Sequence, residues 1–348
     1  MTVVEPTSLA LLACQRSADR SGATWQAVLE PFTGLRLVLS DAAKGIAAGI
    51  AGAAAAQGRG ADGRPPIAHG LDVFHTAQEA QRALRRPWRA AIHACNAADQ
   101  ADGKVADAKR VGRDARTVSG AARAARERAE TGLADLERQY VAWQHARVAL
   151  AVFGPDGTLN DREQAERAIR EAVVELTGPD WQKTRNALTD PRALTFLDHL
   201  HERLRAAVPE DTLRTACVRR WWLRHHRPPA NSAANTIDDL LDAVIRNRQL
   251  DPAEQAAYHR VSTVLRTTVR ASSAVEGINS VLRMHQARHR RMTQPMLDLK
   301  RLYWNCRRFP TGRRRGQSPY EMLGVTLPST DFWTLLTRPP RPPQPVSN

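Results

Sequence analysis

Glu276 has the clearest chemical context among the acidic residues, because it lies early in an expected helix and a crowd of arginines follows it. That pairing suggests a carboxylate that works beside a polyanion. The apolar residues of this helix recur at helical spacing, at Val275, Ile278, Val281 and Leu282. Glu276 lies off that face, one turn from Asn279 and Ser280. On spacing alone, the alternative is a solvated surface glutamate.

Asp41 stands where an expected strand gives way to a helix. The apolar stretch from Leu35 to Leu39 predicts a β-strand that stops at Ser40-Asp41 and passes directly into an alanine-rich helix. An acid at the C-terminal end of a buried strand is where α/β folds place metal ligands and catalytic groups. Because Ser and Asp are also favoured helix N-caps, capping and catalysis both stay open for Asp41.

Asp72 and His75 form a D-x-x-H spacing in the next strand-to-helix unit. A strand is expected from Ile67 to Val73-Phe74, and the helix that follows carries His75. The spacing is short enough for both side chains to face one site at the end of the strand. Taken alone, the motif favours a structural pair.

Basic residues are concentrated in one part of the chain. The 51 Lys and Arg residues outnumber 36 acids, for a formal charge of +15, and 21 basic against 7 acidic residues lie between Arg214 and Arg315. A basic face attracts phosphates by releasing condensed counterions. A GC-rich genome would explain the choice of Arg over Lys, but not the near neutrality elsewhere. The candidate DNA-binding residues are Asn279, Arg283, Arg288, Arg290, Arg291, Arg307, Arg308, Arg313, Arg314 and Arg315.

The elements that position these residues fall into four segments. Two short strands are expected over Thr2–Glu5 and Ser8–Gln15, before the strands that precede Asp41 and His75. From about Ala77 to Leu265 the sequence is almost wholly helical, with mixed charges typical of long exposed hairpin helices. The expected segments are a core part (1–80), a helical insertion (81–265), a C-terminal helix with a basic segment (266–330) and a proline-rich, disordered tail (331–348).

Several classes of protein are disfavoured by composition. No apolar run reaches the roughly 20 residues that a bilayer crossing needs, and the N-terminus lacks a signal core, so we expect a soluble, cytoplasmic protein. The cysteines are scattered without metal-ligand spacing, at Cys14, Cys95, Cys217 and Cys306. His285 and His289 have a spacing that can bind a metal, but without an evident third ligand they favour phosphate contact or plain surface.

The chain resembles the catalytic domain of bacterial insertion-sequence transposases of the DDE type. The resemblance is carried by the strings VVEPTSL, ADRSGATW, VLSDAAKG and GLDVFH, by the WWLRHH region, and by a C-terminal block. In that block a serine-rich turn leads into the helix with V-E-G-I-N-S, and a basic segment ends in GQSPYEMLGV from Gly316 to Val325. The resemblance covers nearly the whole chain. It implies an α/β fold with an RNase H-like mixed sheet, a large all-α insertion after the last strand, and C-terminal helices.

The resemblance also implies a chemistry. Two Mg²⁺ (or Mn²⁺) ions held by carboxylates would cleave and join DNA, with Asp41 and Glu276 as metal-binding catalytic residues and Asp72 and His75 as the D-x-x-H motif. The partners would be double-stranded DNA, both element ends and target, and further copies of the chain. In that fold the first Asp belongs to a first strand, and we expect this strand to be missing here because the sequence opens with what resembles the second strand. The expected explanation is an incomplete, inactive copy, and the alternative is a misassigned start.

Three alternatives stay open. In the first alternative, the catalytic triad would consist of Asp41, Asp72 and Glu276, with the two Asp on successive strands. A non-catalytic nucleic-acid-binding protein would use the basic segment, with Trp221, Trp222 and Trp304 stacking on bases or, more simply, lying in the core. A purely helical scaffold would leave the strings around Asp41 and Asp72 unexplained.

Overall fold

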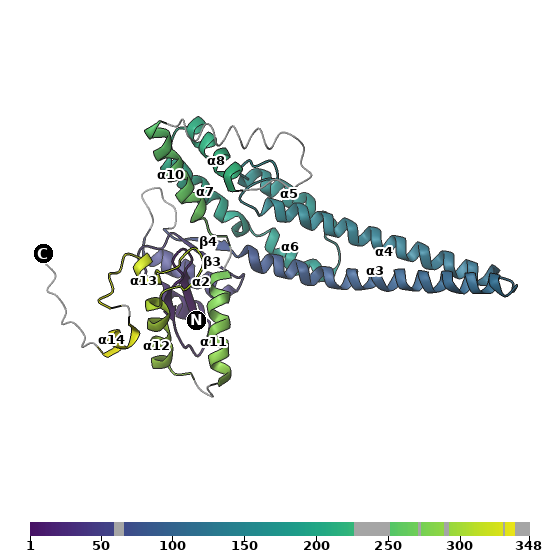
Figure 1. The fold of residues 1–348 in the computed structure, drawn as a ribbon, viewed down its shortest axis with the longest axis horizontal. Coiled ribbons are helices and arrows are strands. Elements are labelled where there is room, and N and C mark those ends of the chain that lie inside the picture. Colours follow the sequence, from purple (N-terminus) through teal and green to yellow (C-terminus); the bar gives the residue numbers. More distant parts are fainter. Residues whose placement is uncertain (59–65, 226–250, 271–272, 289–291, 330, 338–348) are drawn as a thin grey trace. The chain divides into compact units, whose positions relative to one another are not determined.

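The computed structural model describes residues 1–58, 66–225, 251–270, 273–288, 292–329 and 331–337. Contacts divide the chain into two compact units (Figure 1). The first unit comprises Met1–Val38, Ala43–Ile67 and Ala271–Asn348, and the second comprises Leu39–Ala42 and Ala68–Arg270. The sequence predicts boundaries near 81 and 265, whereas the long segment of the second unit runs from Ala68 to Arg270.

Helices dominate, and the four strands of the described part form two separate two-stranded sheets. β1 (Thr2–Glu5) pairs with β2 (Ala10–Cys14), and β3 (Leu37–Ser40) pairs with β4 (Ala68–Leu71). This mixture confirms the expected α/β class at a coarse level.

The β1–β2 hairpin of the first unit is antiparallel and closed by a glutamate. Thr2 lies opposite Cys14 and Glu5 opposite Ala10, with an irregularity between Val3 and Val4. The Glu5 carboxylate accepts the backbone N–H groups of Thr7 at 2.9 Å and Ser8 at 2.6 Å. Hydrogen bonds to Ser8 and Thr7 hold the pKa of Glu5 below its usual range against the opposing effect of burial. Glu5 is therefore a turn-stabilising residue.

Helices α1 (Gly22–Leu29) and α2 (Lys44–Ala56) cross closely because α2 carries glycine at the contact. A Cβ added to Gly49 would lie 2.3 Å from the Cβ of Trp25. Their apolar faces share a core with neighbouring strands, made of Val3, Leu29, Leu35, Val38, Ile46, Ile50, Ala53, Ala54 and Ile67. The alanine-rich sequence after Asp41 thus serves close helix packing.

Helix α12 (Gln294–Cys306) covers the edge of β2 with two side-chain amides. Asn305, which is 1% exposed, accepts from the backbone N–H of Leu11 at 2.8 Å and donates to its carbonyl at 3.0 Å. Gln294, at the other end of the helix, accepts from the N–H of Arg16 at 2.8 Å and donates to the carbonyl of Cys14 at 3.0 Å. These bonds satisfy backbone groups that an open strand edge would leave unpaired.

The other helices of the first unit are α11 (Ser273–Arg288), α13 (Pro319–Met322) and α14 (Phe332–Thr337). Ile278 of α11 is buried in a cluster with Leu11, Cys14 and Leu297, and Leu282 packs against it. A capping box between Ser318 and Glu321 begins α13. The apolar face expected for the Glu276 helix is confirmed at Ile278 and Leu282.

The second unit contains a long helical hairpin and a set of shorter helices (Figure 1). The hairpin is α3 (Val73–Arg110) and α4 (Arg116–Ala149), and the shorter α-helices are α5 (Arg162–Glu175), α6 (Gln182–Leu188), α7 (Thr195–Ala207), α8 (Asp211–His225) and α10 (Pro252–Arg266). Two 3₁₀ turns, η1 (Pro179–Trp181) and η2 (Pro191–Leu194), start at prolines that the sequence marks as breaks.

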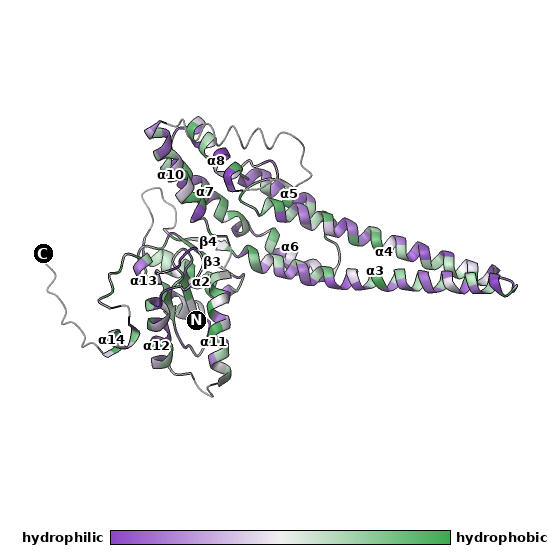
Figure 2. Cartoon of the chain, in the orientation of Figure 1, coloured by the Kyte–Doolittle hydropathy of each residue, from purple (hydrophilic) through white to green (hydrophobic). Residues whose placement is uncertain are grey.

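Small residues form the seam of the hairpin, and larger ones form its base. Near the distal end the seam consists of Ala94, Cys95, Ala98, Ala101, Ala125 and Ala129. At the base, Trp143, Leu150 and Ile169 join Trp181 and Phe196 in the largest core cluster. Figure 2 shows hydrophilic residues on the outside of both hairpin helices. None of the described helices combines the length and apolar character of a membrane span.

The strands are shorter than expected where polar residues end them. β2 is confirmed at Ala10–Cys14, inside the expected range, and β3 reaches Ser40. β4 ends at Leu71 because Asp72 starts α3 as its N-cap, so the expected continuation of the strand to Val73-Phe74 is wrong. His289, Arg290 and Arg291 lie outside the described residues, as do the Arg288 side-chain contacts. The disorder expected for 331–348 is wrong over Phe332–Thr337, which forms α14, and the part from 338 lies outside the described residues.

Candidate functional site

A chain of polar side chains links the ends of β3 and β4 to η2. The ring of His69 on β4 lies with Nε2 2.8 Å from the hydroxyl of Ser40 and Nδ1 3.3 Å from Nη1 of Arg192. Since a guanidinium can only donate, Nδ1 accepts, and the proton of the neutral ring sits on Nε2 and points to Ser40. The Ser40 hydroxyl then donates to the backbone carbonyl of Asp41 at 2.9 Å. Each hydrogen bond therefore has one donor-to-acceptor direction, running from Arg192 through His69 and Ser40 to the carbonyl of Asp41.

The surroundings of His69 keep its ring neutral. Burial, and then the positive charge of Arg192, lower the pKa of His69 from 6.5 to about 4, although Asp190 and Asp41 pull it upward. The protonated ring would place two positive charges in contact. The neutral tautomer is therefore the form that fits the hydrogen bonds.

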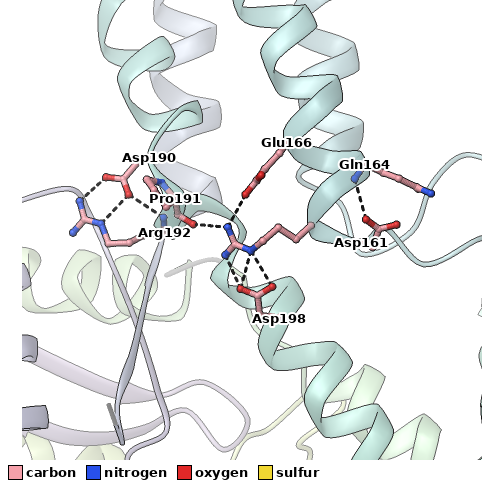
Figure 3. Close-up of polar contacts among 8 residues, drawn as sticks. Asp161, Gln164, Glu166, Asp190, Pro191, Arg192 and Asp198 are labelled. Carbon is pink, nitrogen blue, oxygen red and sulfur yellow. Dashed lines mark hydrogen bonds and ion pairs between the residues drawn. The ribbon is translucent and has the colours of Figure 1, made fainter. Parts of the chain in front are cut away.

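Arg192 is itself held by Asp190, which caps η2 (Figure 3). The guanidinium donates to the carboxylate from Nη2 at 2.6 Å and from Nε at 2.9 Å, a bidentate contact. Hydrogen bonds from Arg192 hold the pKa of Asp190 below its usual range. Next to it, Arg162 grips Asp198 and donates to the carbonyl of Pro191 at 3.1 Å. These contacts fix η2 against the helices that follow it.

Asp41 is an exposed residue directly after β3, two residues before Ala43, which occupies the N-cap position of α2. The structural and the catalytic interpretations of Asp41 both stay open. The carboxylate lies close enough to His69 to raise the pKa of that ring.

Asp72 is a buried helix cap, and His75 is its neighbour. The carboxylate of Asp72 accepts the N–H of Phe74 at 2.8 Å and begins α3, while its residue is 2% exposed. His75 Nε2 lies 3.6 Å from the second carboxylate oxygen. The backbone N–H of Asp72 donates to the carbonyl of Ser40 at 2.9 Å. The D-x-x-H spacing thus has a structural role, as the spacing alone favours.

Glu276 lies in the first turn of α11 with its side chain 32% exposed and 3.9 Å from Arg283. It belongs to the first unit and Asp41 to the second. The convergence of these two carboxylates stays a prediction. Asn279 of the same helix is half-buried and Arg283 is exposed.

The basic segment divides into residues with structural partners and residues open to solvent. Arg308 donates to both carboxylate oxygens of Glu321, at 3.2 and 2.5 Å, and this bond lowers the pKa of Glu321 to about 2. Arg314 donates to the backbone carbonyls of Thr7 at 2.8 Å and Pro6 at 3.1 Å. Both side chains therefore tie the loop before α13 to the rest of the first unit.

Three other arginines of this segment are exposed: Arg307, Arg313 and Arg315. The guanidinium of Arg307 lies 5.7 Å from the ring of Trp304, whose indole N–H donates to the carbonyl of Leu9 at 2.8 Å. Trp221 is stacked between Phe153 and His225, with ring centroids 5.6 and 4.4 Å apart. These two tryptophans are packing residues, the simpler of the two interpretations from sequence.

A complete metal site is not formed by the described side chains. In the part of the chain that the structure describes, no group of three or more His, Cys, Asp or Glu residues is placed to hold an ion. The buried carboxylate of Asp72 caps α3. Asp41 lies beside His69, whose two ring nitrogens already have hydrogen-bond partners. We therefore derive no chemical step through a metal.

No family model, curated protein or solved structure matches this chain in comparisons with known proteins.

Sequence reasoning missed His69, Ser40, Asp190 and Arg192 as members of one network. The one signal in the sequence is a histidine inside a short strand, Ala-His-Gly-Leu. The pairing of positions 69 and 192 depends on tertiary packing across 123 residues.

Proposed function

We propose that the chain is a DNA-binding transposase core of the DDE type that is catalytically incomplete as given. The observation that carries the proposal is the position of Asp41. It follows β3 directly, is exposed, and lies close enough to His69 to raise the pKa of that ring. Metal-dependent phosphodiester chemistry uses carboxylates to hold its ions, and α/β folds place such groups at the ends of strands.

The strand topology is compatible with the same proposal. The described strands form two pairs, β1–β2 and β3–β4, instead of one sheet. A mixed sheet that lacks its first, central strand would be left with two such pairs. Mg²⁺ or Mn²⁺ would be the ion of a complete site, because hard carboxylate oxygens suit these cations.

The non-catalytic alternative draws on the exposed arginines of the first unit. Arg283, Arg307, Arg313 and Arg315 are available for phosphates whether or not any chemistry follows. Both candidates predict DNA binding. They differ in whether Asp41 and Glu276 share one site.

A plasmid-nicking assay with the full chain tests the incomplete-core proposal. We expect duplex binding without nicking in either Mg²⁺ or Mn²⁺, because the described side chains bring no three metal ligands together. Asp72→Asn is the informative variant, since Asn also caps helices and leaves α3 intact. Nicking by the parent chain that Asp72→Asn abolishes would replace the proposal with the Asp41, Asp72, Glu276 triad. Failure to bind duplex DNA would overturn both candidates.

A further inference from the structure

The distal end of the α3–α4 hairpin is more basic than the rest of the hairpin. From Lys104 to Arg128 the sequence has eight Lys and Arg residues against three acids. The remaining parts of the hairpin, 73–103 and 129–149, have six of each. All of the hairpin's net charge, +5, therefore lies at its distal end. The near neutrality of the chain outside the Arg214–Arg315 segment conceals this local excess.

Ion pairs neutralise only part of this charge. Arg110 lies 3.0 Å from Asp107, Arg116 lies 4.0 Å from Asp114, and Arg126 lies 2.6 Å from Asp102. Five further cations make no ion pair within the described residues: Lys104, Lys109, Arg113, Arg123 and Arg128. All five are exposed.

The packing of the hairpin explains why these side chains extend into solvent. The distal seam consists of Ala94, Cys95, Ala98, Ala101, Ala125 and Ala129. Small seam residues let the two helices approach closely, and the seam offers little apolar surface on which a Lys or Arg stem could lie. Figure 2 shows hydrophilic residues continuing to the loop between the helices. The distal end is therefore a convex surface that carries exposed cations (Figure 1).

We propose that this distal surface, residues 104–128, binds the phosphate backbone of duplex DNA. Six of its eight cations are arginines, which grip phosphate oxygens with two donors at once. A membrane surface would favour apolar side chains beside the cations, and Val111 is the one large apolar residue exposed in this fully described stretch. An acidic peptide would favour a groove rather than a convex end.

The length of α3 sets how far this contact lies from the Asp72 end of the helix. Val73 and Lys104 belong to one continuous helix, so about 45 Å separate them. That span corresponds to roughly 13 base pairs of duplex. If duplex DNA binds near Asp41 at one end of the second unit, residues 104–128 would thus contact a second, distant stretch of the same duplex. The inference rests on the proposed function only for the choice of DNA as the polyanion.

The test is the salt dependence of duplex binding by the full chain in EDTA, so that no cleavage enters the result. The distal variant is Lys109→Gln, Arg113→Gln, Arg123→Gln. The matched control, Arg85→Gln, Arg89→Gln, Arg147→Gln, removes the same charge from exposed positions at the hairpin base. The distal variant should lower the log–log salt slope by up to about 2.7 and weaken binding at 0.1 M salt at least about tenfold. The control should leave the slope within about 1 of the parent.

Equal losses in the two variants would overturn the inference, because net charge alone would then explain binding. Vesicle binding supplies a second decisive readout. If the distal variant loses binding to phosphatidylserine vesicles but keeps full duplex affinity, the surface binds membranes and the inference is wrong. Arg113→Gln alone, in the loop between the helices, guards against misfolding of the triple variant and should lower the slope by about 0.9. Failure of the catalytic proposal would leave all these results unchanged.

Discussion

At the scale of single residues, the second unit uses acids mainly to organise its backbone. Asp72 begins α3, Asp161 begins α5 and Asp190 begins η2, each through a side-chain bond to a backbone N–H. Figure 3 shows Asp161 and Asp190. Asp41 differs from these three acids in its position, because Ala43 rather than Asp41 occupies the N-cap position of α2. The contrast between Asp41 and Asp72 is what separates a candidate ligand from a structural acid.

Substitutions at Asp72 should distinguish capping from catalysis. Asp72→Ala should lower the free energy of unfolding by about 1–2 kcal/mol, because α3 loses its N-cap bond. Asp72→Asn should cost clearly less, since the amide oxygen can accept the same N–H of Phe74. Urea denaturation at pH 7 measures both. Equal costs would show that the charge, rather than the cap, stabilises this site.

The neutral His69 ring predicts a dependence of stability on pH. Its folded pKa of about 4 lies below the unfolded value near 6.5, so the unfolded chain takes up a proton first as the pH falls. This contribution is complete above about pH 6.5 and is lost as the pH falls toward 4. After discounting for partial exposure of the ring, the loss is on the order of 1 kcal/mol.

His69→Gln provides the comparison, because Gln does not titrate. Chemical denaturation at pH 7 and pH 4.5 should show a smaller drop for this variant than for the parent chain. Identical drops would assign the acid sensitivity to other groups.

At the scale of elements, the first unit depends on close contacts that the sequence does not announce. Asn305 and Gln294 at the two ends of α12 bond to the backbone of β2 across 294 and 278 to 280 residues. β1, and the end of β3 before Asp41, could be predicted because apolar alternation and a polar stop are local signals. An amide that completes a strand edge leaves no local pattern, so its role could not be predicted.

Gly49 should be intolerant of substitution while Gly103 tolerates it. Gly49→Ala would place a Cβ 2.3 Å from Trp25, so overpacking should destabilise the first unit by about 1–3 kcal/mol. Gly103→Ala, in α3 with nothing within 4 Å, should stabilise by roughly 0.5–1 kcal/mol. Thermal unfolding of both variants checks the pair. A neutral Gly49→Ala would contradict the observed crossing of α1 and α2.

The arginines before α13 should separate into DNA-binding and structural residues. Arg313→Ala with Arg315→Ala should lower the salt slope of duplex binding by up to about 1.8 without changing the unfolding temperature. Arg314→Ala should lower the unfolding temperature and leave the salt slope unchanged, because the variant loses the bonds to the carbonyls of Thr7 and Pro6. Anisotropy titrations and thermal melts measure the two effects. A changed slope with Arg314→Ala alone would reverse this assignment.

At the scale of the whole molecule, the account depends on two carboxylates that belong to different units. The sequence motifs around Asp41 and Glu276 predict their local settings. Asp41 follows a strand and Glu276 lies in the first turn of a helix, as expected. Local patterns could predict these settings, because strand ends and helix faces are encoded nearby. Convergence is a property of tertiary structure, and no local pattern encodes it.

Cysteine cross-linking tests that convergence most directly. In a Cys95→Ala background, where the other native cysteines are buried, Asp41→Cys and Glu276→Cys are paired and treated with a short bis-maleimide. The control pairs Asp41→Cys with Met284→Cys, an exposed position two turns further along α11. Two carboxylates that share metal ions must lie within roughly 10 Å, so the first pair should cross-link rapidly and the control slowly. Cross-linking of the first pair no faster than the control would contradict a shared site of Asp41 and Glu276.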